Sequence, residues 1–289
     1  MISSESFNES IEVGMMHAKL YGSILMLRLS LSFGLLGFAT NTSAADSVMD
    51  ILKPYYPLYN EALQCHGVIA PSGSVNGLTN EPYMTGYCID IDRQKVIETD
   101  KGKRLYILIA GDVSFDENGE EVLRGHAASG LVGMFVLKPN GKGWQVESAN
   151  PTMNAGSYGL GLGGWDLKQF APNTWGFMNE HGDTHQGYTS TSFVILTPNG
   201  RGIMENWIGA SFDSGGSDGC GGQGQRLCND RSADLEIDTS KTVNGFYPLK
   251  LTVNGYNHGK TYKNSIFSIN YQKDKGYIEP NEYPLKDNY

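Results

Sequence analysis

The chain has 289 residues, of which 22 are Lys or Arg and 31 are Asp or Glu, giving a formal net charge of −9. This acidity argues against nucleic acid and anionic lipid surfaces as partners. Glycine occurs 37 times, between short runs of β-branched and aromatic residues, a pattern typical of strands joined by tight turns. The composition therefore predicts an all-β, mainly antiparallel protein.

The first recognisable element is an apolar run from Leu29 to Ala39, preceded by Arg28 and followed by the small residues 43–45. This order of basic, apolar and small residues is typical of a secretory signal. The run is 11 residues long, whereas a membrane-spanning helix needs about 20. We therefore expect residues 1–45 to be a signal peptide region, and a mature protein that is periplasmic or secreted and has no transmembrane anchor. The acidic first residues are unlike a leader, which favours a true start at Met15, Met16 or Met26.

Residues 46–83 are expected to form a short helix and then loop. Apolar residues from Val48 to Tyr55 share one helical face, which Pro54 and Pro57 interrupt. Residues 84–289 are expected to form a single β-rich domain. The sequence thus predicts a β-sandwich or barrel with a short N-terminal helix after the signal peptide.

Two segments indicate how the strands are buried. Residues 104–110 carry apolar side chains at nearly every position, as expected for a strand covered on both faces. Residues 249–254 alternate apolar with polar side chains, as expected for a strand with one face in water. Both patterns fit a sandwich and a barrel equally well.

The mature chain has four cysteines, Cys65, Cys88, Cys220 and Cys228. An even number in an oxidising compartment predicts two disulfides. Proximity in the sequence favours the pairs Cys65–Cys88 and Cys220–Cys228. Their spacing lacks the CxxC pattern of zinc sites, so their expected role is stability.

An internal similarity links residues 126–143 with residues 185–202. At an offset of 59 residues, Pro139-Asn140-Gly141 matches Pro198-Asn199-Gly200, and His126 matches His185. One interpretation is recurrent turn chemistry, because Pro and Asn-Gly suit tight turns. The other is a pair of equivalent hairpins, each with a histidine at the corresponding position.

The densest group of potential metal ligands is His181, Asp183 and His185. In an extended strand these side chains would point to one side, and two histidines with one carboxylate suit zinc or iron(II). The competing interpretation, which we favour, is a polar hairpin turn over residues 180–184 with Gly182 at the bend. A turn would separate the three side chains.

A second candidate site surrounds the expected Cys220–Cys228 loop, where acidic residues gather. Calcium binds to six to eight oxygen atoms, and four carboxylates are candidate ligands: Asp213, Asp218, Asp230 and Asp234. The segment lacks the spacing of a known calcium loop, so a solvated surface loop is the favoured interpretation.

The sequence identifies no nucleophile, because the GxSxG motif is absent and the expected disulfides use all cysteines. We therefore expect an exported, disulfide-stabilised, non-catalytic binding or envelope protein. Its partner would be a glycan or another envelope protein, and no cofactor is expected. The alternative is a metal-dependent hydrolase that uses a divalent metal ion at His181, Asp183 and His185.

Overall fold

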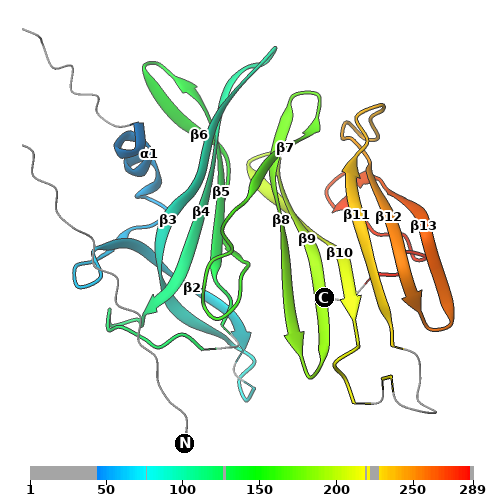
Figure 1. Ribbon diagram of the computed structural model, residues 1–289. Helices are drawn as coiled ribbons and strands as arrows, with labels where there is room; N and C mark the ends of the chain where they lie inside the picture. Colours follow the sequence, from blue (N-terminus) through cyan, green and yellow to red (C-terminus); the bar gives the residue numbers. More distant parts are fainter. Residues whose placement is uncertain (1–43, 76, 126–127, 219, 222–227, 287–289) are drawn as a thin grey trace, which may run out of the picture. The chain divides into compact units, whose positions relative to one another are not determined.

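Antiparallel strands make up most of the chain in the computed structural model (Figure 1), which describes residues 44–289 except 76, 126–127, 219, 222–227 and 287–289. Sheet A has the strand order β1-β2-β3-β4-β5-β6 and sheet B the order β13-β12-β11-β10-β9-β8-β7. The strands of sheet A are β1 (Leu58–Asn60), β2 (Cys65–Val75), β3 (Pro82–Thr99), β4 (Gly102–Phe115), β5 (Leu131–Asn140) and β6 (Gly143–Asn154). Those of sheet B are β7 (Asp166–Ala171), β8 (Thr174–His185), β9 (Tyr188–Asn199), β10 (Gly202–Asp213), β11 (Asp230–Ile237), β12 (Leu249–Asn257) and β13 (Lys260–Ile269).

The two sheets pack on each other through one apolar cluster, which we call the central cluster. It contains Tyr106 and Leu108 of β4 together with Phe177, Val194 and Leu196 of sheet B. Both sheets are open within the described residues, with β1 and β6, and β13 and β7, at their edges. The predicted all-β, antiparallel fold is confirmed, and its form is the sandwich.

Strand β4 is buried on both faces, as its sequence predicts. Leu105, Ile107 and Ile109 face a second cluster that includes Val48 and Leu52. These two residues come from the single described helix, α1 (Ala44–Leu52), so α1 covers the face of sheet A that does not meet sheet B. No helix within the described residues is long and apolar enough to cross a membrane.

The expectation of a loop after this helix is wrong. Strands β1 and β2 occupy much of residues 58–75, and β2 pairs with β3 from Gly67–Cys88 to Val75–Pro82. The ladder shifts register between Pro71 and Val75. Proline cannot donate a ladder hydrogen bond and is tolerated at such irregular positions.

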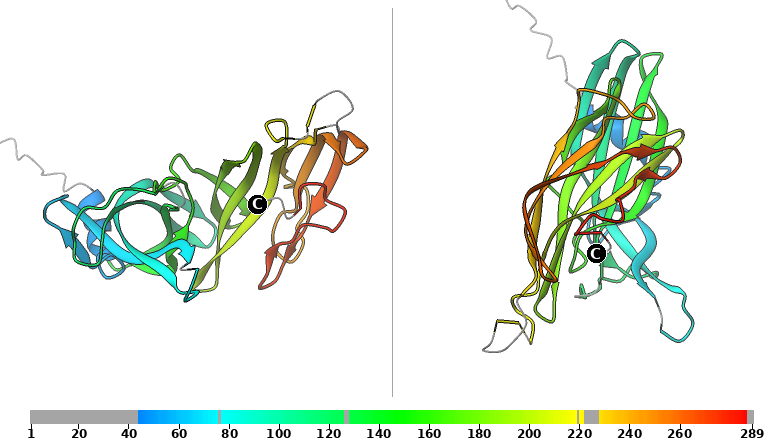
Figure 2. Two further views of the ribbon diagram at one scale, coloured as in Figure 1. Left: turned by 90° about the horizontal axis from the view of Figure 1, so that it is seen from below. Right: turned by 90° about the vertical axis from the view of Figure 1, so that its right-hand side faces the viewer.

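The C-terminal segment covers the outer face of sheet B and includes the short strands β14 (Tyr271–Gln272) and β15 (Gly276–Tyr277). Figure 2 shows this red segment crossing the strands of the sheet. The Tyr283 hydroxyl donates a hydrogen bond of 2.6 Å to the Gly209 carbonyl, and the Glu279 carboxylate accepts one of 2.7 Å from the Gly209 amide. These bonds attach the segment to β10.

The two Pro-Asn-Gly segments form equivalent hairpins. Asn140 pairs with Gly143 between β5 and β6, and Asn199 pairs with Gly202 between β9 and β10. Gly141 has a φ of +58° and Gly200 a φ of +61°, which glycine adopts without steric cost. His185 ends β8 and precedes the second hairpin, whereas His126 lies outside the described residues.

Both predicted disulfides are present. Cys65 and Cys88 join β2 to β3 with 5.5 Å between their Cα atoms, and Cys220 and Cys228 close the acidic segment with 5.0 Å between theirs. The described structure has no free cysteine. The first disulfide lies where the β2–β3 ladder ends, beside the corner pocket described below.

Candidate functional site

The predicted metal group lies on β8, which remains extended through His185. The favoured turn over residues 180–184 is therefore wrong, and the chain instead turns at Gln186 and Gly187, where φ is +50° and +80°. Gly182 pairs with Thr191, and a Cβ at this glycine would lie 2.8 Å from the Thr191 hydroxyl oxygen. This glycine permits close packing between strands and makes no bend.

An extended β8 does not by itself produce a metal site. A strand rises about 3.3 Å per residue, so positions four residues apart, such as His181 and His185, are about 13 Å apart along it. The His181 ring instead packs edge-on against Trp207, with 5.4 Å between ring centroids. The described part of the chain contains no group of three His, Cys, Asp or Glu side chains that could hold a metal ion.

The acidic segment does not gather its carboxylates either. Asp213 and Asp230 pair across β10 and β11, and the Asp213 carboxylate accepts a 2.6 Å hydrogen bond from the Gly215 amide. Asp234 lies four residues farther along β11 and is exposed, about 13 Å from Asp230 by strand geometry. Asp218 lies in the exposed loop. Four ligands in these positions do not surround one calcium ion.

A pocket of about 880 Å³, which we call the corner pocket, adjoins the Cys65–Cys88 disulfide. Ligand sites commonly measure about 300–1,000 Å³ and combine apolar walls with a few polar groups. The corner pocket has this composition. Its apolar lining includes Met49, Ile89, Ile91 and Val113, and its polar lining includes Gln64, His66, Asp90, Ser114, Glu121 and Arg124.

The charged residues of the corner pocket differ in how they are held. Arg124 donates a hydrogen bond of 3.0 Å from Nε to the Val113 carbonyl, and its Nη2 lies 3.2 Å from an Asp112 carboxylate oxygen. Asp90 and Glu121 form no ion pair with any other described residue. The pocket therefore contains Arg124, whose charge is balanced by Asp112, and two carboxylates, Asp90 and Glu121, that have no cationic partner among the described residues.

His66, another polar residue of this lining, lies on β2 and is half-buried. Its ring packs edge-on against Tyr59 of β1, with 5.0 Å between ring centroids. The pairing of Tyr59 with His66 across the β1–β2 ladder produces this contact. An aromatic neighbour restricts the imidazole, so the pocket contains at least two polar side chains with restricted positions, His66 and Arg124.

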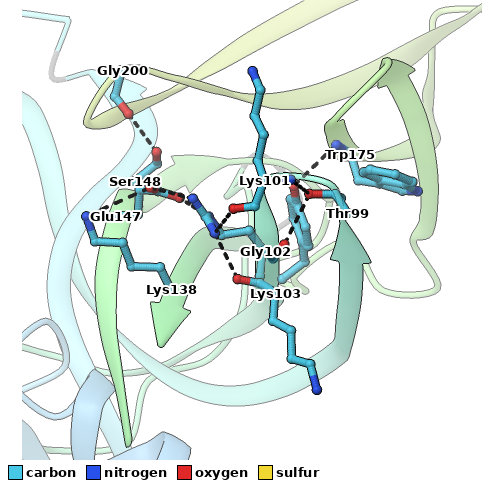
Figure 3. Close-up of polar contacts among 11 residues, drawn as sticks. Thr99, Lys101, Gly102, Lys103, Lys138, Glu147, Ser148, Trp175 and Gly200 are labelled. Atoms are coloured by element: carbon cyan, nitrogen blue, oxygen red, sulfur yellow. Dashed lines mark hydrogen bonds and ion pairs between the residues drawn. The ribbon is translucent and has the colours of Figure 1, made fainter. Parts of the chain in front are cut away.

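A second pocket of about 660 Å³, the junction pocket, lies between β6 and the turn from β9 to β10. Figure 3 shows the polar contacts beside it. The Ser148 hydroxyl donates a hydrogen bond of 2.6 Å to the Gly200 carbonyl, and the Ala149 amide donates one of 2.9 Å to the Arg201 carbonyl. These bonds fix a turn of sheet B against an edge strand of sheet A.

A further hydrogen bond joins the sheets nearby. The Trp175 amide donates to the Tyr106 hydroxyl over 3.3 Å. Burial raises the pKa of the Tyr106 hydroxyl, and the hydrogen bond from the Trp175 amide opposes this shift. Tyr106 also belongs to the central cluster. Its hydroxyl therefore adds a hydrogen bond between the sheets beside their apolar packing.

Together, the fold and the two pockets described above define a disulfide-stabilised all-β protein with concave surfaces on its sheets. Comparisons of the chain with protein-family models, with curated proteins and with solved structures found no significant match. Sequence reasoning did not identify either pocket, because each combines residues from segments far apart in the chain. The single local signal was the pair Cys65 and Cys88, which marks one wall of the corner pocket.

Proposed function

We propose that this chain is an exported, non-catalytic binding protein whose corner pocket holds part of a glycan. The main support for this proposal is the composition of the pocket, which combines an apolar lining with polar groups that both donate and accept hydrogen bonds. Sugar hydroxyls both donate and accept, and the C–H groups of a sugar ring pack on apolar surfaces. Carboxylates, a histidine and an arginine supply complementary donors and acceptors.

Replacing His66 by Ala should weaken glycan binding about tenfold or more, because it removes an oriented polar contact inside the pocket. The measurement is calorimetric titration with oligosaccharides found by screening a glycan panel. His181→Ala is the matched control, since His181 is also a half-buried strand histidine packed against an aromatic ring. It should bind like the unaltered protein. Equal losses of glycan affinity in the two variants, or no binding to any glycan of the panel, would contradict the assignment of glycan binding to the corner pocket.

Export is supported by the leader-like residues 1–45 and by two disulfides, which persist in oxidising compartments. We expect the leader to be removed near Ala45, so that the mature protein begins near Asp46. Intact-mass analysis of protein recovered from the periplasm or medium measures this directly. A full-length chain retained in the membrane fraction would contradict the expectation.

A second candidate is an envelope protein that binds another protein through the β2–β3 hairpin. Four large apolar residues are exposed on this hairpin: Val75 at 55%, Leu78 at 97%, Tyr83 at 52% and Met84 at 52%. Exposed apolar groups of this size favour a contact with a partner. Binding through the hairpin would not depend on His66, so the His66→Ala variant separates the two candidates.

A further inference from the structure

The junction pocket has an excess of positive charge in an acidic protein. Its charged lining residues are Lys138, Glu147 and Arg201. Arg104 forms two hydrogen bonds with the Glu147 carboxylate, and the one from Nη2 to Oε1 measures 3.1 Å. This guanidinium also donates to the carbonyls of Lys101 and Lys103. Arg104 therefore neutralises Glu147, which leaves two cations at the pocket.

These two cations are available to a ligand. The Lys138 ammonium lies 4.0 Å from Glu147, at the limit of an ion pair, and the lysine side chain is 41% exposed. Arg201 is exposed and forms no ion pair with any other described residue. A cation without a partner carboxylate attracts anions more strongly than a paired one.

The backbone that carries Arg201 is held in place. The Arg201 carbonyl accepts the hydrogen bond from the Ala149 amide, and the preceding Gly200 carbonyl accepts the one from the Ser148 hydroxyl. Ser148 is only 3% exposed. Both contacts use backbone atoms of the turn, so they persist when the Arg201 side chain is changed. Lys142 occupies the equivalent position of the β5–β6 hairpin but does not line the pocket.

We propose that the junction pocket binds an anionic ligand through a carboxylate or phosphate group. The guanidinium of Arg201 presents paired donors that match two oxygens of such a group, and Lys138 supplies a second positive charge. Gln145 adds an amide donor, and Tyr55 adds an aromatic surface for the rest of the ligand. This binding is separate from the glycan contact proposed for the corner pocket.

The test titrates the mature protein at low ionic strength with sodium glucuronate and, separately, with inorganic phosphate, following backbone amide shifts by NMR. Binding of glucuronate alone assigns the site to a sugar acid, and binding of phosphate alone assigns it to a phosphate group. Arg201→Ala should weaken binding about tenfold or more, and Arg201→Lys should weaken it less, because it keeps the charge and loses the paired donors. Lys142→Ala, in the equivalent turn, should change affinity less than about twofold.

Equal losses for Arg201→Ala and Lys142→Ala would overturn the proposal, because they would indicate diffuse attraction to a basic surface. Absence of binding to both probes would overturn it as well. The His66→Ala variant should bind these probes with unchanged affinity. This control distinguishes failure of the junction site from failure of the corner pocket.

Discussion

Replacing Leu108 by Ala should lower the free energy of unfolding by about 2–5 kcal/mol. Leu108 is fully buried in the central cluster between the two sheets. The substitution removes apolar contacts from both sheets and leaves a cavity that strands on either side fill only in part. Urea unfolding followed by tryptophan fluorescence measures the loss.

The matched control is Leu123→Ala, because Leu123 is 99% exposed. It should change the free energy of unfolding by less than about 0.5 kcal/mol. Similar losses in the two variants would contradict the account in which the sheets are held together by the central cluster.

Gly156→Ala should destabilise the protein by about 3 kcal/mol or more, for two reasons that add. Gly156 has a φ of +111°, which side-chain-bearing residues rarely adopt, and an added Cβ would overlap the Leu160 carbonyl and lie 2.9 Å from the Leu162 amide nitrogen. Backbone strain costs about 1–3 kcal/mol, and overpacking costs a similar amount. Urea unfolding again supplies the measurement.

Gly164→Ala separates these two contributions. Gly164 has a φ of +81°, but a Cβ there would have no neighbour within 4 Å. Its cost should be that of the left-handed conformation alone, about 1–2 kcal/mol. If the two variants were equally stable, the close backbone packing of this glycine-rich loop would not contribute to stability.

Several features of the fold could be predicted because their causes are local. The both-sided apolar pattern of residues 104–110 predicted β4, and the two Pro-Asn-Gly segments predicted tight turns. The disulfides followed from proximity in the sequence. Each of these signals depends on a few neighbouring residues, so no knowledge of distant contacts was needed.

The errors came from residues that usually mark loops. The loop expected after the helix includes Pro71 and Gly73, which instead lie in β2 beside an irregularity of the ladder. Gly182 suggested a bend, but it lies inside β8 and pairs with Thr191 of β9. In both cases the partner strand decides the conformation, and local propensity does not contain that information.

The pockets could not be predicted, because they arise from contacts between distant segments. His66 of β2 and Arg124 of the loop after β4 line one pocket, and Lys138 of sheet A and Arg201 of sheet B line the other. No spacing rule connects such residues. The metal candidates, in contrast, were close in sequence, and the extended strand separates them.

The most direct test of the central claim is an NMR titration of the mature protein with an oligosaccharide that binds it. Backbone amide shifts should change most at the corner pocket, over residues 64–66, 88–91 and 121–124. The amide of His181 should not respond. Shifts concentrated on the β2–β3 hairpin tip or on the outer face of sheet B, with the corner pocket unchanged, would contradict the account.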